Sequence, residues 1–338
     1  MGGKEHLKIL ADNKVGAIKL GILVVVLALL VTLPFWSNLA WITIATLILI
    51  NMAIAQMWNL LAGYTGLISL GQHMFIGLGG YSLGVITEFL GLPIILGFLV
   101  AAVASVLFAL IISVPIFKIK GVYFTIGTVV LASVLQLFFS TWGFVNYGVG
   151  INIRAVHRIQ PESIYFLMLG VAILSVAVVF VLLRSKAGLA LMAMRDNENA
   201  AEVRGVPLYK TKLMCFLISA FVTGIAGAAL FVNLGFILPD SGFTINWTVA
   251  MLFIVVIGGK GTIEGPIIGA IIFVLLDQWL FRFPGYSMLI LGIFAIVLIM
   301  VAPKGIMGVV HKFNGGRNFF STRRRPKKED LKALNTES

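Results

Sequence analysis

The sequence predicts an all-α fold, a polytopic bundle of transmembrane helices. Hydrophobic residues make up 60% of the 338 positions and charged residues only 11%, whereas about a quarter of the residues of a soluble domain are charged. Uncharged stretches long enough to cross a bilayer recur along the whole chain. We therefore expect about ten spans, interrupted by two glycine-rich breaks, with both termini in the cytoplasm.

Polar or glycine-bearing connections separate the expected spans. The segment 247–257 is too short to cross alone, because about twenty helical residues are needed, so we expect it to be tilted or covered by protein. In chain order the expected spans are 21–35, 41–61, 72–89, 94–117, 121–142, 164–183, 213–235, 247–257, 267–281 and 286–302.

Positive charge is distributed unevenly over the two sides of such a bundle. With ten spans, 22 of the 25 Lys and Arg residues fall on one side, which the positive-inside rule assigns to the cytoplasm. An odd number of spans would lose this asymmetry. The membrane thus explains the net charge of +12, and we expect membrane lipid and no nucleic acid as a partner.

The expected organisation is one membrane domain, 20–302, between two basic segments. Residues 1–19 form a basic cytoplasmic N-terminus without a signal-peptide cleavage site, so we expect the first span to be retained. Residues 303–338 form a basic cytoplasmic tail, which we expect to be disordered near anionic lipid.

The most polar interior segment, 184–212, carries nine charged side chains between two long apolar runs. We expect it to lie in the cytoplasm and to form a short helix over 189–203. Gly205 is placed for the left-handed position that ends helices, and Pro207 follows where a helix cannot continue. Such a helix would provide a binding surface for a soluble partner. The alternative is that the segment is only a solvated linker.

Two glycine-rich stretches, 63–71 and 258–266, each lie between an inward-running and an outward-running span. Glycine permits tight turns and close backbone approach, and transporters use broken helices to present helix ends to a solute. The alternative is that both are tight cytoplasmic hairpins. The glycines expected to line a pathway are Gly63, Gly66, Gly71, Gly258, Gly259, Gly261 and Gly265.

The sequence contains no recognisable pattern for catalysis or metal binding. Cys215 is the only cysteine, which excludes a disulfide within the chain and a cysteine-based metal site. His73 has no second ligand three or four positions away, so we expect it to satisfy a backbone group. Lys260 does not belong to a phosphate loop, because Ile254 and Gly261 stand where that motif requires Gly and Ser or Thr. We expect no enzymatic activity and no metal or cofactor bound by this chain.

Four stretches together resemble one family of membrane proteins. They are NLLAGYTGLISLGQHMFIGLGGY (59–81), IKGVYFTIGT (119–128), AMRDNENAAEVRGVPLYKTKLMCFLISAFVTGIAGAAL (193–230) and VIGGKGTIEGPIIGA (256–270). The chain is similar, over about 41–302, to the inner-membrane permeases of branched-chain amino-acid ABC transporters, the hydrophobic amino-acid uptake family. Urea and short-chain amide permeases are close relatives of that family.

The resemblance implies that transport requires several different subunits. A second related permease completes the pathway, two cytoplasmic ATPase subunits bind ATP and Mg, and an extracytoplasmic solute-binding protein delivers the solute. Arg204 departs from the small or apolar residue that many members carry, which puts the choice of ATPase partner in doubt. The positions that match the family's ATPase-contacting motif are Arg195, Asp196, Asn197, Glu198, Ala201 and Gly205.

These observations favour a permease subunit of an importer for branched-chain or other hydrophobic amino acids. Two alternatives stay open: a urea or short-chain amide permease of the same family, and a stand-alone carrier or channel for a small neutral solute. The hypothesis for coupling is that the ATPases move the helix around 196–203 as a rigid body. The two spans that it joins would then transmit the motion.

Overall fold

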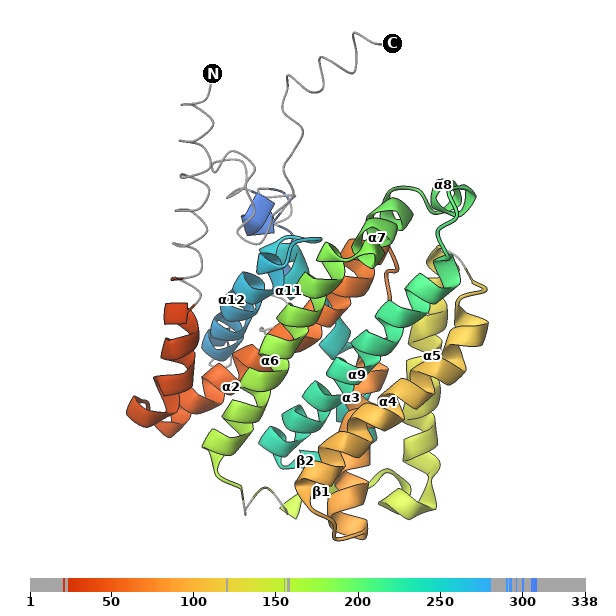
Figure 1. The fold of residues 1–338 in the computed structure, drawn as a ribbon. Coiled ribbons are helices and arrows are strands. Elements are labelled where there is room, and N and C mark those ends of the chain that lie inside the picture. Colours follow the sequence, from red (N-terminus) through yellow and green to blue (C-terminus); the bar gives the residue numbers. More distant parts are fainter. Residues whose placement is uncertain are drawn as a thin grey trace, which may run out of the picture.

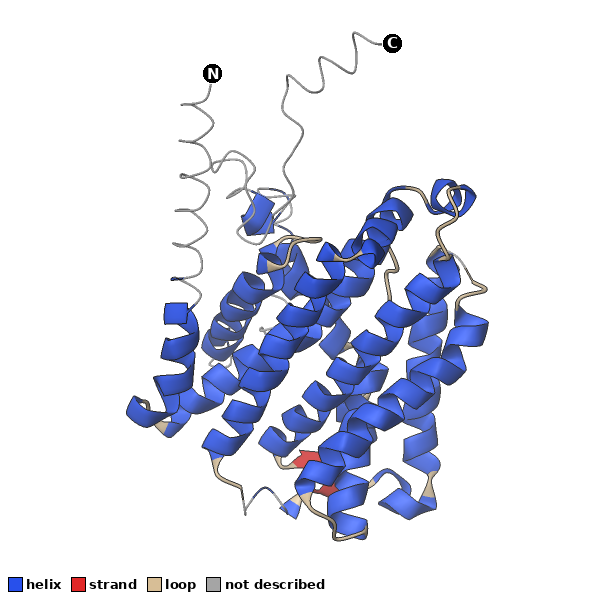
Figure 2. Ribbon diagram, viewed as in Figure 1, coloured by secondary structure: helices blue, strands red, loops and turns tan. Residues whose placement is uncertain are grey.

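Long helices run side by side from one end of the molecule to the other (Figures 1 and 2). The computed structural model describes residues 21, 24–119, 121–154, 156, 159–280, 290, 292–293, 296, 300 and 305–308. In this part of the chain the only strands are β1 (Ile151–Asn152) and β2 (Phe236–Ile237), which pair antiparallel. The predicted all-α, polytopic bundle is therefore confirmed.

Most expected spans correspond to one helix each. The helix Val24–Trp36 is followed by α2 (Leu39–Asn59), α3 (His73–Gly84), α4 (Ile94–Ile116), α5 (Val122–Thr141), α6 (Pro161–Arg184), α7 (Lys186–Asp196), α8 (Glu198–Val203), α9 (Leu208–Leu234), α10 (Pro239–Gly242), α11 (Asn246–Gly258) and α12 (Glu264–Leu280). Short π-helices extend α2 over Leu60–Thr65 and α3 over Val85–Phe89, and a 3-10 helix covers Gly143–Gly148.

Six stretches among the described residues are long and apolar enough to cross a membrane. They are α2 with its π-helix, α4, α5, α6, α9 and the combined segment Pro239–Gly258. The expected span 247–257 is too short to cross alone. The short helix α10 precedes α11, and together they cover 20 residues, which is the length of a span. The expected span 286–302 lies mostly outside the described residues, as do 1–19 and nearly all of 303–338.

Local sequence signals set the helix ends. The Asn38 side chain accepts a hydrogen bond from Trp41 N and caps α2, and Pro161 begins α6, where its missing N–H costs nothing. Gly235 ends α9 in the left-handed conformation. These ends are where the chain reverses direction between spans.

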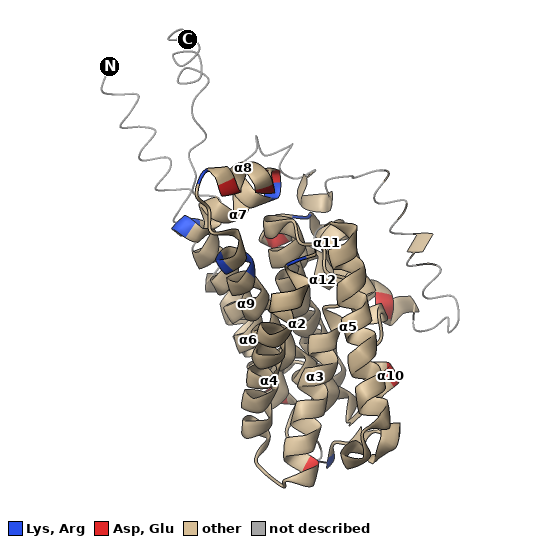
Figure 3. Ribbon diagram, turned by 90° about the vertical axis from the view of Figure 1, so that its right-hand side faces the viewer, with Lys and Arg blue, Asp and Glu red and all other residues tan. Residues whose placement is uncertain are grey.

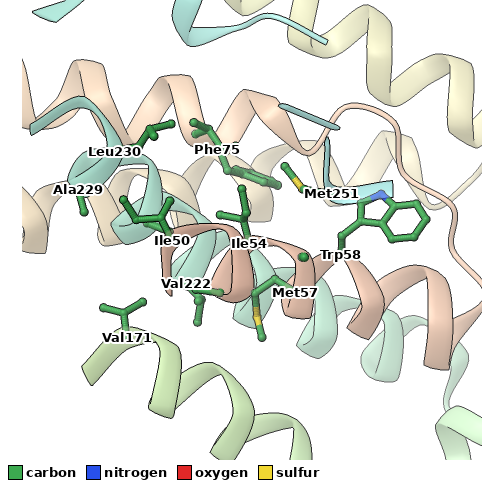
Figure 4. Packing of buried hydrophobic residues seen from close by; sticks show 14 of the residues in the cluster. Ile50, Ile54, Met57, Trp58, Phe75, Val171, Val222, Ala229, Leu230 and Met251 are labelled. Atoms are coloured by element: carbon green, nitrogen blue, oxygen red, sulfur yellow. The ribbon is translucent and has the colours of Figure 1, made fainter. Parts of the chain in front are cut away.

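The centre of the bundle is built from α2, α3 and α9, which bring large apolar side chains such as Ile54, Phe75 and Val222 together (Figure 4). Apolar burial alone does not drive helices together in lipid, so association depends on close packing of small residues. A Cβ added to Gly79 of α3 would overlap the carbonyl oxygen of Gly224 on α9. The backbones of α3 and α9 therefore touch at this crossing.

The two ends of the bundle differ in charge. Most of the described Lys and Arg residues gather at the end that carries α7 and α8 (Figure 3), while β1 and β2 lie at the opposite end (Figure 1). By the positive-inside rule we expect the α7–α8 end to face the cytoplasm. The opposite end carries a cluster of nearly parallel aromatic rings, with Tyr81 stacked on Phe139 and Phe243.

Replacing Gly79 with leucine tests the α3–α9 crossing. The larger side chain has no space there, so Gly79→Leu should lower stability by about 1–3 kcal/mol, the usual cost of overpacking. The measurement is the thermal midpoint of the purified protein in detergent. The control is Gly170→Leu on α6, where an added Cβ meets no atom within 4 Å; equal losses in the two variants would contradict the close crossing.

Candidate functional site

The segment between α6 and α9 forms two short helices, so the expected single helix over 189–203 is wrong. Asn197 interrupts it with an extended backbone, and its side-chain oxygen accepts a hydrogen bond from Ala200 N at 3.0 Å. Asn is favoured at helix N-caps because its short side chain satisfies a free backbone N–H. Asn197 therefore ends α7 and starts α8, and the segment bends at this point.

Gly205 closes α8 as the sequence predicts. Its φ of 80° is in the left-handed region. Gly205 N donates to Glu202 O at 2.9 Å, and Val206 N donates to Ala201 O at 3.1 Å. This pair of bonds is a Schellman motif, which satisfies the free carbonyls at a helix end.

The elbow formed by α7 and α8 is attached to two membrane helices. Only Ser185 separates α7 from α6. On the other side, the buried Lys212 ammonium of α9 pairs with the Glu198 carboxylate of α8 at 2.5 Å. A displacement of α8 would therefore pull on α9 through this ion pair.

The other candidate residues of the elbow lie at its surface, with one exception. Ala201 is buried against the protein, whereas Arg195 and Asp196 are exposed and form a long ion pair of 3.4 Å. Exposed pairs of this kind contribute little to stability. The most exposed apolar side chain of α8 is Val203, which is 89% accessible.

The first glycine-rich stretch becomes non-helical at Gly66, whose φ is 78°. Gly63 is not part of this break, because it lies inside the π-helix that extends α2. Side chains from α2 and α5 hold the segment 66–71. Trp58 Nε1 donates to Ser69 O at 2.8 Å, Thr125 Oγ1 donates to Ile68 O at 2.8 Å, and the Thr128 hydroxyl accepts from Leu70 N and Gly71 N.

The second stretch forms the turn between α11 and α12. Gly258 is the last residue of α11, and Gly259 and Gly261 adopt positive φ values of 124° and 75°. Gly265 already belongs to the first turn of α12, which shortens the expected break. Thr262 Oγ1 donates to Gly259 O at 2.7 Å and accepts from Gly265 N at 3.0 Å, so one hydroxyl fixes the turn.

Asn59 brings the two glycine stretches together. Its amide donates to Thr262 O and accepts from Gly261 N, both at 2.8 Å. A side chain on Gly63 would collide with Asn59 and lie 2.9 Å from Gly261 N. We call this meeting point of Asn59, Gly63 and Gly261 the glycine junction.

The glycine junction also lies against the elbow. A Cβ on Gly261 would lie 3.4 Å from Arg195 Nη1, and a Cβ on Gly66 would lie 3.8 Å from Arg195 Cα. Burial, and then the positive charge of Arg195, lower the pKa of the neighbouring Lys260 ammonium. Arg195 of the elbow thus lies beside both glycine stretches.

Several buried polar side chains deeper in the bundle pair with one another. His73 Nδ1 lies 2.9 Å from Thr248 Oγ1, and the ring also hydrogen-bonds to the backbone of Leu70, the kind of partner that was expected. Gln72 donates to Ser219 and, at 3.3 Å, to Thr223. Among the described residues there is no group of three His, Cys, Asp or Glu side chains that could hold a metal.

Comparison with known proteins identifies the family of this chain. Residues 38–302 match the family model described as branched-chain amino acid transport system / permease component. The chain belongs to this family. It is a multi-pass membrane protein, as the six apolar spans already indicate.

Several individual relatives are similar along most of the chain. The high-affinity branched-chain amino acid transport system permease protein LivM of Escherichia coli (strain K12) is 26% identical over 84% of this chain and 74% of its own length. LivM of Salmonella typhimurium gives the same identity and coverage. The autoinducer 2 import system permease protein LsrC of an Enterobacter species is 24% identical over 74% of this chain and 76% of its own length. No solved structure gives a significant match.

Several residues of the site were not predicted from the sequence. Thr125, Thr128 and Lys212 lie within stretches that carry the family resemblance, yet composition gives no sign that they hold a loop or an elbow. Asn59 also opens one of these stretches, but its local sequence shows only a polar residue near the end of an expected span. An amide or a cation within a membrane segment is the feature that could have identified such residues, since these groups need a partner there.

Removing the Asn59 amide tests the glycine junction. Asn59→Leu leaves Gly261 N and Thr262 O without partners, at a cost of about 1–3 kcal/mol for each buried group. We expect a lower thermal midpoint in detergent. Asn51→Leu, which loses a single bond to Leu47 O of its own helix, is the control and should cost less; a smaller loss in Asn59→Leu would contradict the junction.

A double substitution tests the ion pair between the elbow and α9. Glu198→Met alone leaves the buried Lys212 ammonium unpaired, which is strongly destabilising, whereas removal of both charges is often tolerated. Glu198→Met with Lys212→Met should therefore be more stable than Glu198→Met alone, as measured by thermal midpoint. If the two charges act independently, the double variant will instead be the less stable one.

Proposed function

We propose that this chain is a membrane-spanning subunit of an ATP-driven importer for branched-chain or other hydrophobic amino acids. The observation that carries the proposal is the elbow, a cytoplasmic helix pair attached to α6 and α9 in a chain that belongs to the branched-chain amino acid permease family. The bundle crosses the cell membrane ten times, counting the expected span 286–302.

The importer contains a second related permease, two cytoplasmic ATPase subunits and an extracytoplasmic binding protein. ATP and Mg are bound by the ATPases. This division is supported by the names of the relatives, which are permease proteins of transport systems. It is also consistent with the absence of a phosphate-loop motif from the sequence.

In this proposal α8 is the part of the chain that the ATPase binds. Arg195, Asp196, Asn197, Glu198, Ala201 and Gly205 build the elbow, but its outward contact comes from exposed groups such as Val203. When the ATPase dimer closes on ATP, α8 moves and α6 and α9 follow. Arg195 carries the same displacement to the glycine junction, where glycine backbones can change conformation at low cost.

The amino-acid solute is favoured over urea or amides by the relatives. The LivM proteins of Escherichia coli and Salmonella typhimurium, which are named for branched-chain amino acids, align over 84% of the chain, compared with 74% for the autoinducer 2 permease. The composition of the bundle agrees with this choice. Lys212 and Glu264 are the only charged side chains buried within the described residues, and both lie at cytoplasmic helix ends, so the remaining interior suits a solute without net charge.

A substitution at Val203 tests the proposed contact between α8 and the ATPase. Val203→Asp places a charge in the apolar centre of the proposed contact and should weaken ATPase binding at least about tenfold, or roughly 1.4 kcal/mol. The side chain is 89% exposed, so folding should be unaffected. The measurement is co-purification of the ATPases with the permease, together with leucine uptake in proteoliposomes.

The matched control is Val149→Asp. Val149 is also an exposed valine, at 76%, and lies at the opposite end of the molecule. It should leave ATPase binding intact. Full ATPase binding by Val203→Asp, or by the stronger combination of Glu198→Arg with Gly205→Pro, would refute the role of the elbow.

Reconstitution separates the importer from a stand-alone carrier or channel. Leucine uptake by proteoliposomes should require this chain, its partner permease, both ATPases, the binding protein and ATP. Leucine or urea flux through this chain alone, without nucleotide, would contradict the proposal and favour the stand-alone alternative.

A further inference from the structure

Gln56 is a buried amide without a partner. Its side chain is 0% exposed, and neither its nitrogen nor its oxygen has a hydrogen-bond partner among the described residues. Asn51 and Gln72 also have an unpartnered oxygen, but each donates through its amide nitrogen. Leaving both groups of a buried amide unpaired is costly, and polar groups kept inside a membrane at such a cost default to a functional role.

The position of Gln56 relates it to the glycine junction. It lies three residues before Asn59 on α2, and residues three apart share a helix face. The Asn59 amide reaches the turn between α11 and α12, and α2 packs against both of these helices. Gln56 therefore lies about one helical turn deeper in the membrane on the face of α2 that meets α11 and α12.

The chemistry of an amide defines what it could bind there. It offers one hydrogen-bond acceptor and two donors and carries no charge. A carboxylate can accept from its nitrogen, and an ammonium group can donate to its oxygen. The backbone of an amino acid carries both groups and has no net charge, so one neutral amide complements it without burying an unpaired ion.

We propose that the Gln56 side chain is a transient binding site for the zwitterionic backbone of the amino-acid solute, between α2 and the α11–α12 pair. The inference rests on the proposed function and adds a residue of the pathway to it. The solute reaches Gln56 when the elbow displaces the glycine junction, which lies directly on its cytoplasmic side. In the structure described here the amide is fully buried and unpartnered.

Gln56→Met tests the proposal in the complete transporter, because two readouts should move in opposite directions. Replacing an unpaired buried amide with an apolar side chain of similar length is neutral or stabilising, so the thermal midpoint should stay or rise. Leucine uptake in proteoliposomes should fall about tenfold or more, since a hydrogen bond to a charged group contributes at least about 1.4 kcal/mol. Gln56→Asn, which keeps both polar atoms, should retain more uptake than Gln56→Leu.

Gln72→Met is the matched control, because Gln72 is equally buried but donates to Ser219 and Thr223. It should lower the thermal midpoint. A similar drop in Gln56→Met would show that the amide has a structural partner and would overturn the inference, as would unchanged uptake. If the unsubstituted transporter fails to take up leucine, the proposed function itself is wrong, and the inference falls with it.

Discussion

The requirement that buried backbone polar groups find hydrogen-bond partners controls this structure. Helices meet it by themselves, but the segments 66–71 and 259–263 leave helical geometry and must find partners elsewhere. Side chains supply them: Trp58, Thr125 and Thr128 hold the first segment, while Asn59 and Thr262 hold the second. Each irregular segment is thus pinned to helices that are distant in sequence.

This constraint links the inside of the bundle to the elbow. Gly66 and Gly261 have no side chains, so Arg195 of α7 lies close to both glycine stretches. In the proposed coupling, the glycine backbones at this contact can change conformation at low cost. The Glu198–Lys212 ion pair fixes the other end of the elbow to α9.

The same constraint makes an unpaired polar group informative. Asn59 and Gln72 have comparable burial to Gln56, yet they have partners that fix a turn or join two helices. Gln56 differs only in lacking them. Among the buried side-chain amides of the described residues, Gln56 is the one with neither polar atom partnered, which agrees with the proposal that a partner arrives during transport.

Hydropathy by itself determined the fold class and the positions of most spans, because crossing a bilayer requires length and apolar composition alone. Local rules also located the end of the elbow at Gly205, since a left-handed helix end favours glycine regardless of surroundings. Only the tertiary structure decided that Asn197 divides the elbow, that Gly63 stays helical and that Asn59 joins two glycine stretches about two hundred positions apart. These features depend on which backbone groups lack a partner after the helices have packed, and that is not determined by any local stretch of sequence.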